Sequence, residues 1–185
     1  MNNHYKLSRL QLALAVGAGV AITAIALNSC VSIPKGANAV SPFDKTRYLG
    51  KWYELARFDF KFEKGLDNVT ASYFAKQDGT IEVVNRGRDY KSGKWKESVG
   101  KAKFVKDDTT GRLKVSFFGP FYAGYNVVAI DRDYQYALVA GNNLDYLWIL
   151  SRTTSIPDNI KRAYLAKARS IGYNTNKLIW TKHGR

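Results

Sequence analysis

Few side chains in this chain of 185 residues are suited to covalent chemistry. It has one cysteine, Cys30, and two histidines, His4 and His183, near opposite ends of the sequence. These cannot build a catalytic triad or an ordinary metal site. The sequence also contains no GxSxG and no phosphate-cradling glycine loop. Glu54 is expected to be a satisfied core acid or a ligand hydrogen-bond acceptor, not a general base. We therefore expect no catalytic residue, metal or cofactor.

Cys30 lies in a context that favours lipid attachment. A basic, acid-free N-terminus precedes an uncharged stretch over residues 12–27, which ends in Leu27-Asn28-Ser29-Cys30. This pattern is typical of a secretory signal with a lipoprotein cleavage box, although Asn28 departs from the small or apolar residue usual there. A diacylglycerol thioether, the palmitate-bearing anchor of such proteins, would explain a lone cysteine. The alternatives are an inert thiol or an uncleaved membrane helix, but sixteen uncharged residues are fewer than the roughly 20 that span a bilayer.

Three parts are predicted along the chain. Residues 1–29 form the signal peptide, residues 30–47 form a lipidated tether, and residues 48–185 form one barrel domain. The formal net charge is +14. The basic residues occur singly along strand-like segments, as at Lys101 and Lys103, which indicates a solvated sheet face and argues against a nucleic-acid partner.

Strand patterns fill the region between residues 50 and 151. Apolar and polar residues alternate over short runs, and turn sequences such as Gln77-Asp78-Gly79 separate them. This series predicts an all-β fold, an eight-stranded antiparallel up-and-down barrel with room inside for one small ligand. The expected strands cover residues 51–60, 67–76, 80–88, 95–105, 111–119, 123–131, 135–140 and 145–151.

One C-terminal α-helix is predicted over residues 156–171. Its apolar residues fall on a single stripe, so the helix is expected to pack outside the barrel. Ser155 and Asp158 predict a capping box at its start, and Gly172 predicts its end. A last short strand over residues 177–181 is expected to pair with the first.

Strand alternation, started from Trp52, predicts which side chains point inward. They combine small residues with aromatic ones and a few polar groups, which favours a pocket for an elongated apolar ligand over a core filled by its own aromatics. A β-bulge would reverse the alternation beyond it. The predicted ligand-binding residues are Glu54, Ala56, Phe58, Ala71, Tyr73, Val83, Asn85, Ser98, Gly100, Val115, Phe117, Tyr125, Val127, Val139, Tyr146 and Trp148.

Three short motifs occur in order along the chain: Gly50-Lys51-Trp52-Tyr53-Glu54, then Asp133-Tyr134-Gln135-Tyr136, then Ser151-Arg152. With these motifs the chain resembles the lipocalins, and within them the bacterial outer-membrane lipocalins related to apolipoprotein D, over residues 43–181.

The resemblance implies that Gly50, Trp52 and Arg152 are fold markers, with Arg152 packed across Trp52 at the closed end of the barrel. It also implies that four loops surround the open mouth. These loops carry Lys61, Lys64, Lys91, Lys94, Pro120, Phe121 and Tyr122, a proposed basic and aromatic rim.

The function expected from this resemblance is non-enzymatic binding and carriage of fatty acids or lysophospholipids in envelope maintenance or stress. Val31 follows the cysteine, and the Asp that such lipoproteins use as an inner-membrane retention signal is missing, which implies the periplasmic face of the outer membrane. A tetrapyrrole or isoprenoid carrier, a lipocalin-type enzyme and a homodimer are left open.

Overall fold

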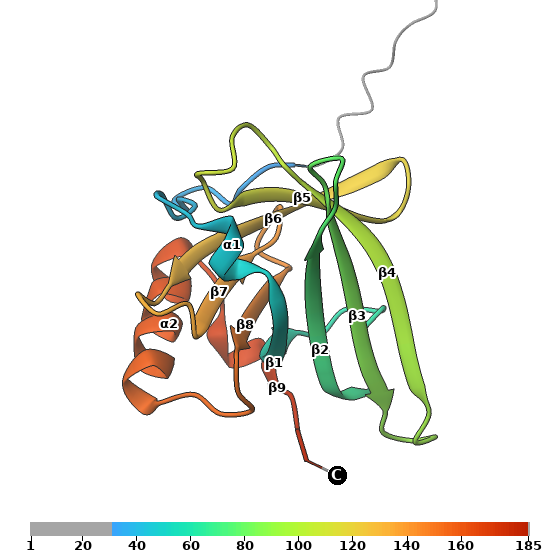
Figure 1. Cartoon of the computed structure of the whole chain (residues 1–185). Helices are drawn as coiled ribbons and strands as arrows, with labels where there is room; N and C mark the ends of the chain where they lie inside the picture. The colour runs from blue at the N-terminus through green and yellow to red at the C-terminus, as the bar shows by residue number, and fades with distance from the viewer. Residues whose placement is uncertain (1–30, 185) are drawn as a thin grey trace, which may run out of the picture.

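The computed structural model describes residues 31–184, so Cys30 and the predicted signal peptide lie outside the described residues. Strands dominate the described part of the chain (Figure 1). The strands are β1 (Gly50–Phe58), β2 (Leu66–Ala75), β3 (Ile81–Asp89), β4 (Trp95–Phe104), β5 (Arg112–Phe118), β6 (Phe121–Ile130), β7 (Tyr136–Ala140), β8 (Leu147–Ser151) and β9 (Leu178–Trp180). The helices are α1 (Lys45–Tyr48), α2 (Asp158–Ile171) and the short 3-10 helix η1 (Thr175–Lys177).

Neighbouring strands pair antiparallel in sequence order from β2 to β8, and β8 then pairs with β1. The ring closes because β1 also pairs with β2, so that Tyr53 lies opposite both Thr70 and Ser151. The predicted eight-stranded up-and-down barrel is therefore confirmed. The additional strand β9 pairs with the second half of β1, as predicted for the last strand. Among the described residues, no helix is long and apolar enough to cross a membrane.

Apolar side chains form two layers, one inside the barrel and one outside it. The inner cluster fills one end of the barrel around Trp52, with Phe43 and Tyr48 packed against it. The outer cluster lies between the barrel wall and α2, which buries Tyr164 and Ala168. Figure 1 shows α2 beside β7 and β8. The stripe of the predicted helix therefore packs outside the barrel, as expected.

The end of α2 at Ile171 agrees with the prediction, but the helix starts two residues later than predicted and its N-terminal cap differs. The helix begins at Asp158 after Pro157, which makes no side-chain cap hydrogen bond, so Ser155 and Asp158 do not form a capping box. Pro157 is suited to this place because it fixes the backbone before the first turn. Gly172 ends the helix in the left-handed conformation, at φ 111°.

The segment before β1 belongs to the packed domain. The Val40 amide donates to the Val127 carbonyl and the Phe43 amide donates to the Thr109 carbonyl. Phe43 is buried in the inner cluster. Residues 30–47 were predicted as a tether, yet the structure packs the chain against the barrel well before residue 48.

A β-bulge in β1 changes which side chains point inward. Glu54 lies opposite Leu150, but Ala56 lies opposite Ile149, so one extra residue stands in β1. Beyond the bulge the alternation is reversed. Ala56 and Phe58 consequently pack in the outer cluster under α2 and not in the interior, which corrects their predicted placement. Arg57 takes the inward position instead.

Candidate ligand-binding site

The barrel encloses a cavity of about 670 Å³. Its deeper walls come from buried apolar and aromatic side chains such as Tyr73, Val83 and Leu113. Exposed residues also line it, including Phe62 in the loop after β1 and Phe118 at the end of β5, so the cavity opens to the surface at that end. A cavity of this size and composition suits one small apolar or amphipathic molecule.

Most of the predicted interior residues line this cavity. Val127 and Val139 lie in the inner cluster at the filled end of the barrel and do not reach the cavity. Gly100 is covered by Phe117, because a Cβ atom built there would lie 2.7 Å from the Phe117 ring. The predicted residues that line the cavity are Glu54, Ala71, Tyr73, Val83, Asn85, Ser98, Val115, Phe117, Tyr125, Tyr146 and Trp148.

Three tyrosine hydroxyl groups form a chain at the filled end. The Tyr125 hydroxyl lies 2.5 Å from that of Tyr48 and 2.7 Å from that of Tyr73. Burial raises the pKa of all three well above the ordinary value for tyrosine, so the hydroxyls stay neutral. Three hydroxyl protons share two hydrogen bonds, which leaves one proton for another acceptor. Because Tyr73 and Tyr125 line the cavity, that acceptor can belong to a ligand.

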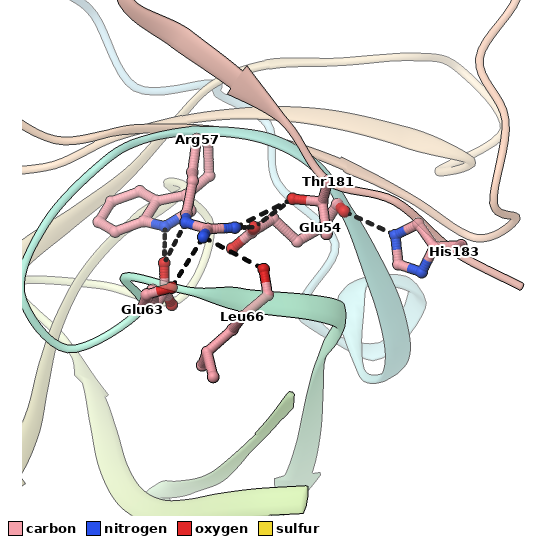
Figure 2. Close-up of polar contacts among 7 residues, drawn as sticks. Glu54, Arg57, Glu63, Leu66, Thr181 and His183 are labelled. Atoms are coloured by element: carbon pink, nitrogen blue, oxygen red, sulfur yellow. Dashed lines mark hydrogen bonds and ion pairs between the residues drawn. The ribbon is translucent and has the colours of Figure 1, made fainter. Parts of the chain in front are cut away.

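A buried ionic cluster forms another part of the wall (Figure 2). The Arg57 guanidinium donates to the Glu54 carboxylate at 2.6 Å and to the backbone carbonyl of Glu63 at 2.7 Å. Thr181 donates a further hydrogen bond to the same Glu54 oxygen at 2.6 Å. The nearest Glu63 carboxylate oxygen lies 3.8 Å from Arg57 Nε. Glu54 is thus a satisfied buried acid, consistent with its expected structural role.

Glu63 is the less well satisfied acid of this cluster. Its side chain accepts a hydrogen bond from Trp148 Nε1 at 3.2 Å. Burial and the neighbouring Glu54 raise the pKa of Glu63 well above its ordinary value, although Trp148 and Arg57 oppose the shift. Sequence reasoning missed Glu63 as a cavity-lining residue and did not place Arg57 on the inner side of β1. Arg57 faces inward only because of the bulge, and Glu63 lies in the loop after β1, where no strand alternation applies.

The mouth of the cavity is aromatic. Phe62, Phe118 and Phe121 line it with 62%, 68% and 65% of their surface exposed, and the Phe62 and Phe118 ring centres lie 5.9 Å apart. Tyr122 also lines the cavity. Phe121 and Tyr122 agree with the expected rim, whereas the expected Pro120 does not line the cavity. Phe62 and Phe118 were not predicted to belong to the rim.

The predicted basic residues of the rim agree only partly with the residues that line the cavity. Lys61 lines the cavity, whereas Lys64, Lys91 and Lys94 do not. Lys96, which was not predicted, lines it instead and forms an ion pair with Asp89 at 2.9 Å.

The three fold markers meet at the filled end. The Arg152 guanidinium lies 3.8 Å from the centre of the Trp52 ring. Gly50 adopts φ +89°, and a Cβ atom there would lie 3.5 Å from Arg152 Nη1. The predicted packing of Arg152 across Trp52 is confirmed. In the described part of the chain, no group of three His, Cys, Asp or Glu side chains is placed to hold a metal ion.

A closed antiparallel barrel with an internal cavity and an outer helix defines a class of small ligand-holding proteins. Comparison with known proteins agrees with this class. A family model described as a lipocalin-like domain matches residues 43–183, and the chain belongs to the lipocalin family.

Two relatives and one solved structure show which proteins the chain is similar to. It is 56% identical over 149 residues to the outer membrane lipoprotein Blc of Citrobacter freundii, which covers 80% of this chain and 84% of the relative. It is 34% identical over 140 residues to apolipoprotein D of Mus musculus, which covers 71% of this chain and 70% of the relative. The crystal structure of the cockroach allergen Per a 4 superposes with a TM-score of 0.64 at 23% identity, over 83% of this chain and 96% of that one.

Proposed function

We propose that this protein binds and carries lipids with one long acyl chain, fatty acids or lysophospholipids, and does so without catalysis. The observation that supports the proposal is the cavity of about 670 Å³, which is lined mainly by apolar side chains and opens through an aromatic mouth. Burial of an acyl chain contributes about 0.8 kcal/mol per CH₂ group. Micromolar binding needs about 8 kcal/mol, so partial burial of a long chain is sufficient after the cost of association.

Attachment to the periplasmic face of the bacterial outer membrane is part of the same proposal. The name of the Citrobacter freundii relative, an outer membrane lipoprotein, supports it. The lipoprotein cleavage box ending at Cys30 and the Val31 that follows it also support it. Replacing Cys30 with Ala should move the protein from the outer-membrane fraction of a sucrose gradient to the soluble fraction. Retention of the variant in the outer membrane would contradict the anchor.

Two alanines of β2 offer a matched test of binding in the cavity. Ala71 lines the cavity, whereas Ala75 is exposed at the end of the same strand. In a titration with a fluorescent fatty acid, Ala71→Trp should weaken binding by about tenfold or more, equal to at least 1.4 kcal/mol, because the indole occupies ligand volume. Ala75→Trp should bind like the wild type. Equal affinities of all three proteins would contradict binding inside the barrel.

The identity of the carried ligand has its own measurement. Mass spectrometry of lipid that co-purifies with the detergent-extracted protein should detect fatty acid or lysophospholipid. A coloured preparation would instead support a tetrapyrrole or another pigment. Light scattering would measure whether two barrels pair, since the homodimer stays a prediction.

A further inference from the structure

The outer face of the barrel at β4 and β5 is strongly basic. Lys101 and Lys103 are exposed on β4, and Arg112 and Lys114 are half-buried on β5. Buried residues of the inner cluster alternate with them along both strands, so all four side chains point away from the cavity. We call these four residues the basic wall.

Two lysines of the basic wall repel each other. Lys103 lies directly opposite Lys114 in the register of β4 and β5. Like charges at opposite positions of an antiparallel pair destabilise the sheet. In the described part of the chain neither lysine forms an ion pair, although the Lys114 ammonium lies 5.1 Å from the centre of the Tyr122 ring. An anionic partner from outside would relieve this repulsion.

The neighbouring pair of strands balances its charges. Glu82 of β3 lies opposite Lys101 of β4, and Arg86 of β3 lies opposite Glu97 of β4. Asp78 also lies 3.9 Å from Lys101. This matching of opposite charges does not continue from β4 to β5, where a lysine meets a lysine. The excess positive charge is therefore concentrated on the β5 side of the basic wall.

The first described residues are attached beside this wall. The Val31 carbonyl accepts a hydrogen bond from Arg112 Nη2 at 3.1 Å, and the Ser32 hydroxyl donates to the Asn142 carbonyl at 2.8 Å. A lipid on Cys30 would be attached one residue, about 3.8 Å of chain, before the contact with Arg112. The proposed anchor would thus bring the basic wall, and not the opposite side of the barrel, next to the bilayer.

We propose that the basic wall docks on anionic lipid head groups of the membrane that carries the anchor. The barrel then lies with β4 and β5 toward the bilayer and with α2 away from it. Figure 1 shows β4 and α2 on opposite sides of the barrel. The proposal rests on the lipid anchor of the proposed function and adds the orientation in which the anchored barrel is held.

The expected strength of docking follows from the charges. Each Lys or Arg near an anionic membrane surface strengthens association about fivefold, so Lys103 and Lys114 together contribute about 25-fold. Salt screens this attraction, because the Debye length falls to about 3 Å at 1 M ionic strength. Docking should therefore require anionic lipid and disappear in concentrated salt.

Fluorescence quenching in vesicles measures the orientation. The detergent-extracted lipoprotein is reconstituted into vesicles of phosphatidylcholine alone or of equal parts phosphatidylcholine and phosphatidylglycerol, both with spin-labelled lipid. Val99, outward on β4 and 55% exposed, and Asn159, exposed on α2, are replaced singly by Cys and labelled with a fluorophore. The Val99→Cys label should be quenched in the anionic vesicles only, and salt near 1 M should abolish the quenching. The Asn159→Cys label should stay bright in both.

A pair of charge variants tests the wall itself. Lys103→Gln combined with Lys114→Gln should lower the ratio of docked to undocked protein about 25-fold and so abolish the quenching at Val99. Lys91→Gln combined with Arg162→Gln removes the same charge from exposed positions off the wall and should keep the quenching. The urea midpoint of the first variant should not fall below that of the wild type, because a neutral pair replaces a repulsive one. That measurement separates lost docking from misfolding.

Four results would overturn docking by the basic wall and leave lipid carriage standing. They are equal quenching at Val99 in both kinds of vesicle, full quenching in the Lys103 and Lys114 variant, the same loss in both charge variants, and quenching at Asn159 instead. Dimming that rises with protein density without spin-labelled lipid would assign the wall to a second copy of the chain and also overturn the proposal. A protein that does not float with the vesicles would overturn the anchor together with the docking.

Discussion

The Arg152 guanidinium lies 3.8 Å from the centre of the Trp52 ring and also donates to backbone carbonyls of the segment before β1. Its Nη2 reaches the Arg47 carbonyl at 2.7 Å and the Leu49 carbonyl at 2.9 Å, and its Nη1 reaches Lys51 at 2.8 Å. The last residue of the third sequence motif therefore fastens the first motif and α1 to the filled end of the barrel.

Replacing Arg152 with Ala should lower the free energy of unfolding by roughly 2–4 kcal/mol. The variant loses the ring contact, worth about 0.5–2 kcal/mol, and leaves several carbonyls without their charged donor. Urea unfolding measures the loss. Arg162, which is exposed on α2, supplies the control, and Arg162→Ala should stay close to wild type. Equal stability of the two variants would mean that Arg152 does not hold the filled end together.

The tyrosine chain predicts unequal effects of two similar substitutions. Tyr125→Phe removes the middle hydroxyl and leaves the buried hydroxyls of Tyr48 and Tyr73 without their partner. It should cost about 2–4 kcal/mol of unfolding free energy. Tyr73→Phe removes an end of the chain, leaves the Tyr48–Tyr125 bond intact and should cost about 1 kcal/mol. The prediction fails if thermal or urea unfolding ranks the two variants in the opposite order.

A substitution at Gly100 of β4 tests how closely the Phe117 side chain of β5 packs on it. A Cβ atom at residue 100 would lie 2.7 Å from the Phe117 ring and 2.8 Å from the Ser116 carbonyl oxygen. Gly100→Ala should therefore destabilise the protein by about 1–3 kcal/mol and push Phe117 into the cavity, which weakens lipid binding. At Gly119 a Cβ atom meets nothing within 4 Å, so Gly119→Ala should leave both properties near wild type. Unchanged lipid affinity in a folded Gly100→Ala variant would contradict this account.

Glu63 predicts a pH dependence of stability with a defined sign. Burial and Glu54 raise its pKa in the folded protein, so the folded state holds this proton more tightly than the unfolded chain. Stability is therefore lost as the pH rises from the ordinary value of 4.5 through the raised folded value. Relative to Glu63→Gln, the wild type should lose up to about 1.4 kcal/mol for each pH unit in this window. Urea unfolding of both proteins across the pH range measures the difference.

The pKa shift of Asp67 has the opposite sign, so its effect on stability depends on pH in the opposite direction. Hydrogen bonds from Arg88, at 2.9 and 2.8 Å, lower the pKa of Asp67 to about 2. Its contribution to stability is present above the ordinary value of 3.8 and is lost as the pH falls through about 2. As the pH rises, the wild type should therefore gain stability relative to Asp67→Asn but lose stability relative to Glu63→Gln. The same trend in both variants would refute the assignment to Glu63.

Strand positions and most inward-facing residues were predictable from the sequence because alternation holds between bulges. Tyr73, Val83 and Phe117 were placed in the interior on that basis, and all three line the cavity. Ala56 and Phe58 were misplaced because the bulge in β1 leaves no distinct mark in the sequence. Their apolar character suits either face, since α2 covers the outer wall at this point.

The polar groups of the site were harder to predict. Glu63 lies in a loop, and its placement beside Trp148 depends on how that loop folds over the mouth. Lys96 belongs to β4 and reaches the cavity, whereas the neighbouring loop residues Lys91 and Lys94 do not. Local sequence determines that a loop is basic or aromatic, but the path of the loop backbone determines which of its side chains reach a ligand.

The pairing of Tyr53 with Ser151 affects how fast the barrel folds. These partners come from the first and last strands of the ring, so closure depends on contacts between distant parts of the chain, and such topologies fold over milliseconds to seconds. Until β8 arrives, the free edge of β1 presents unpaired amides and carbonyls on which another chain can add a strand. Keeping such chains apart during that interval limits their aggregation. Variants that delay closure of the barrel should therefore aggregate before they lose lipid binding.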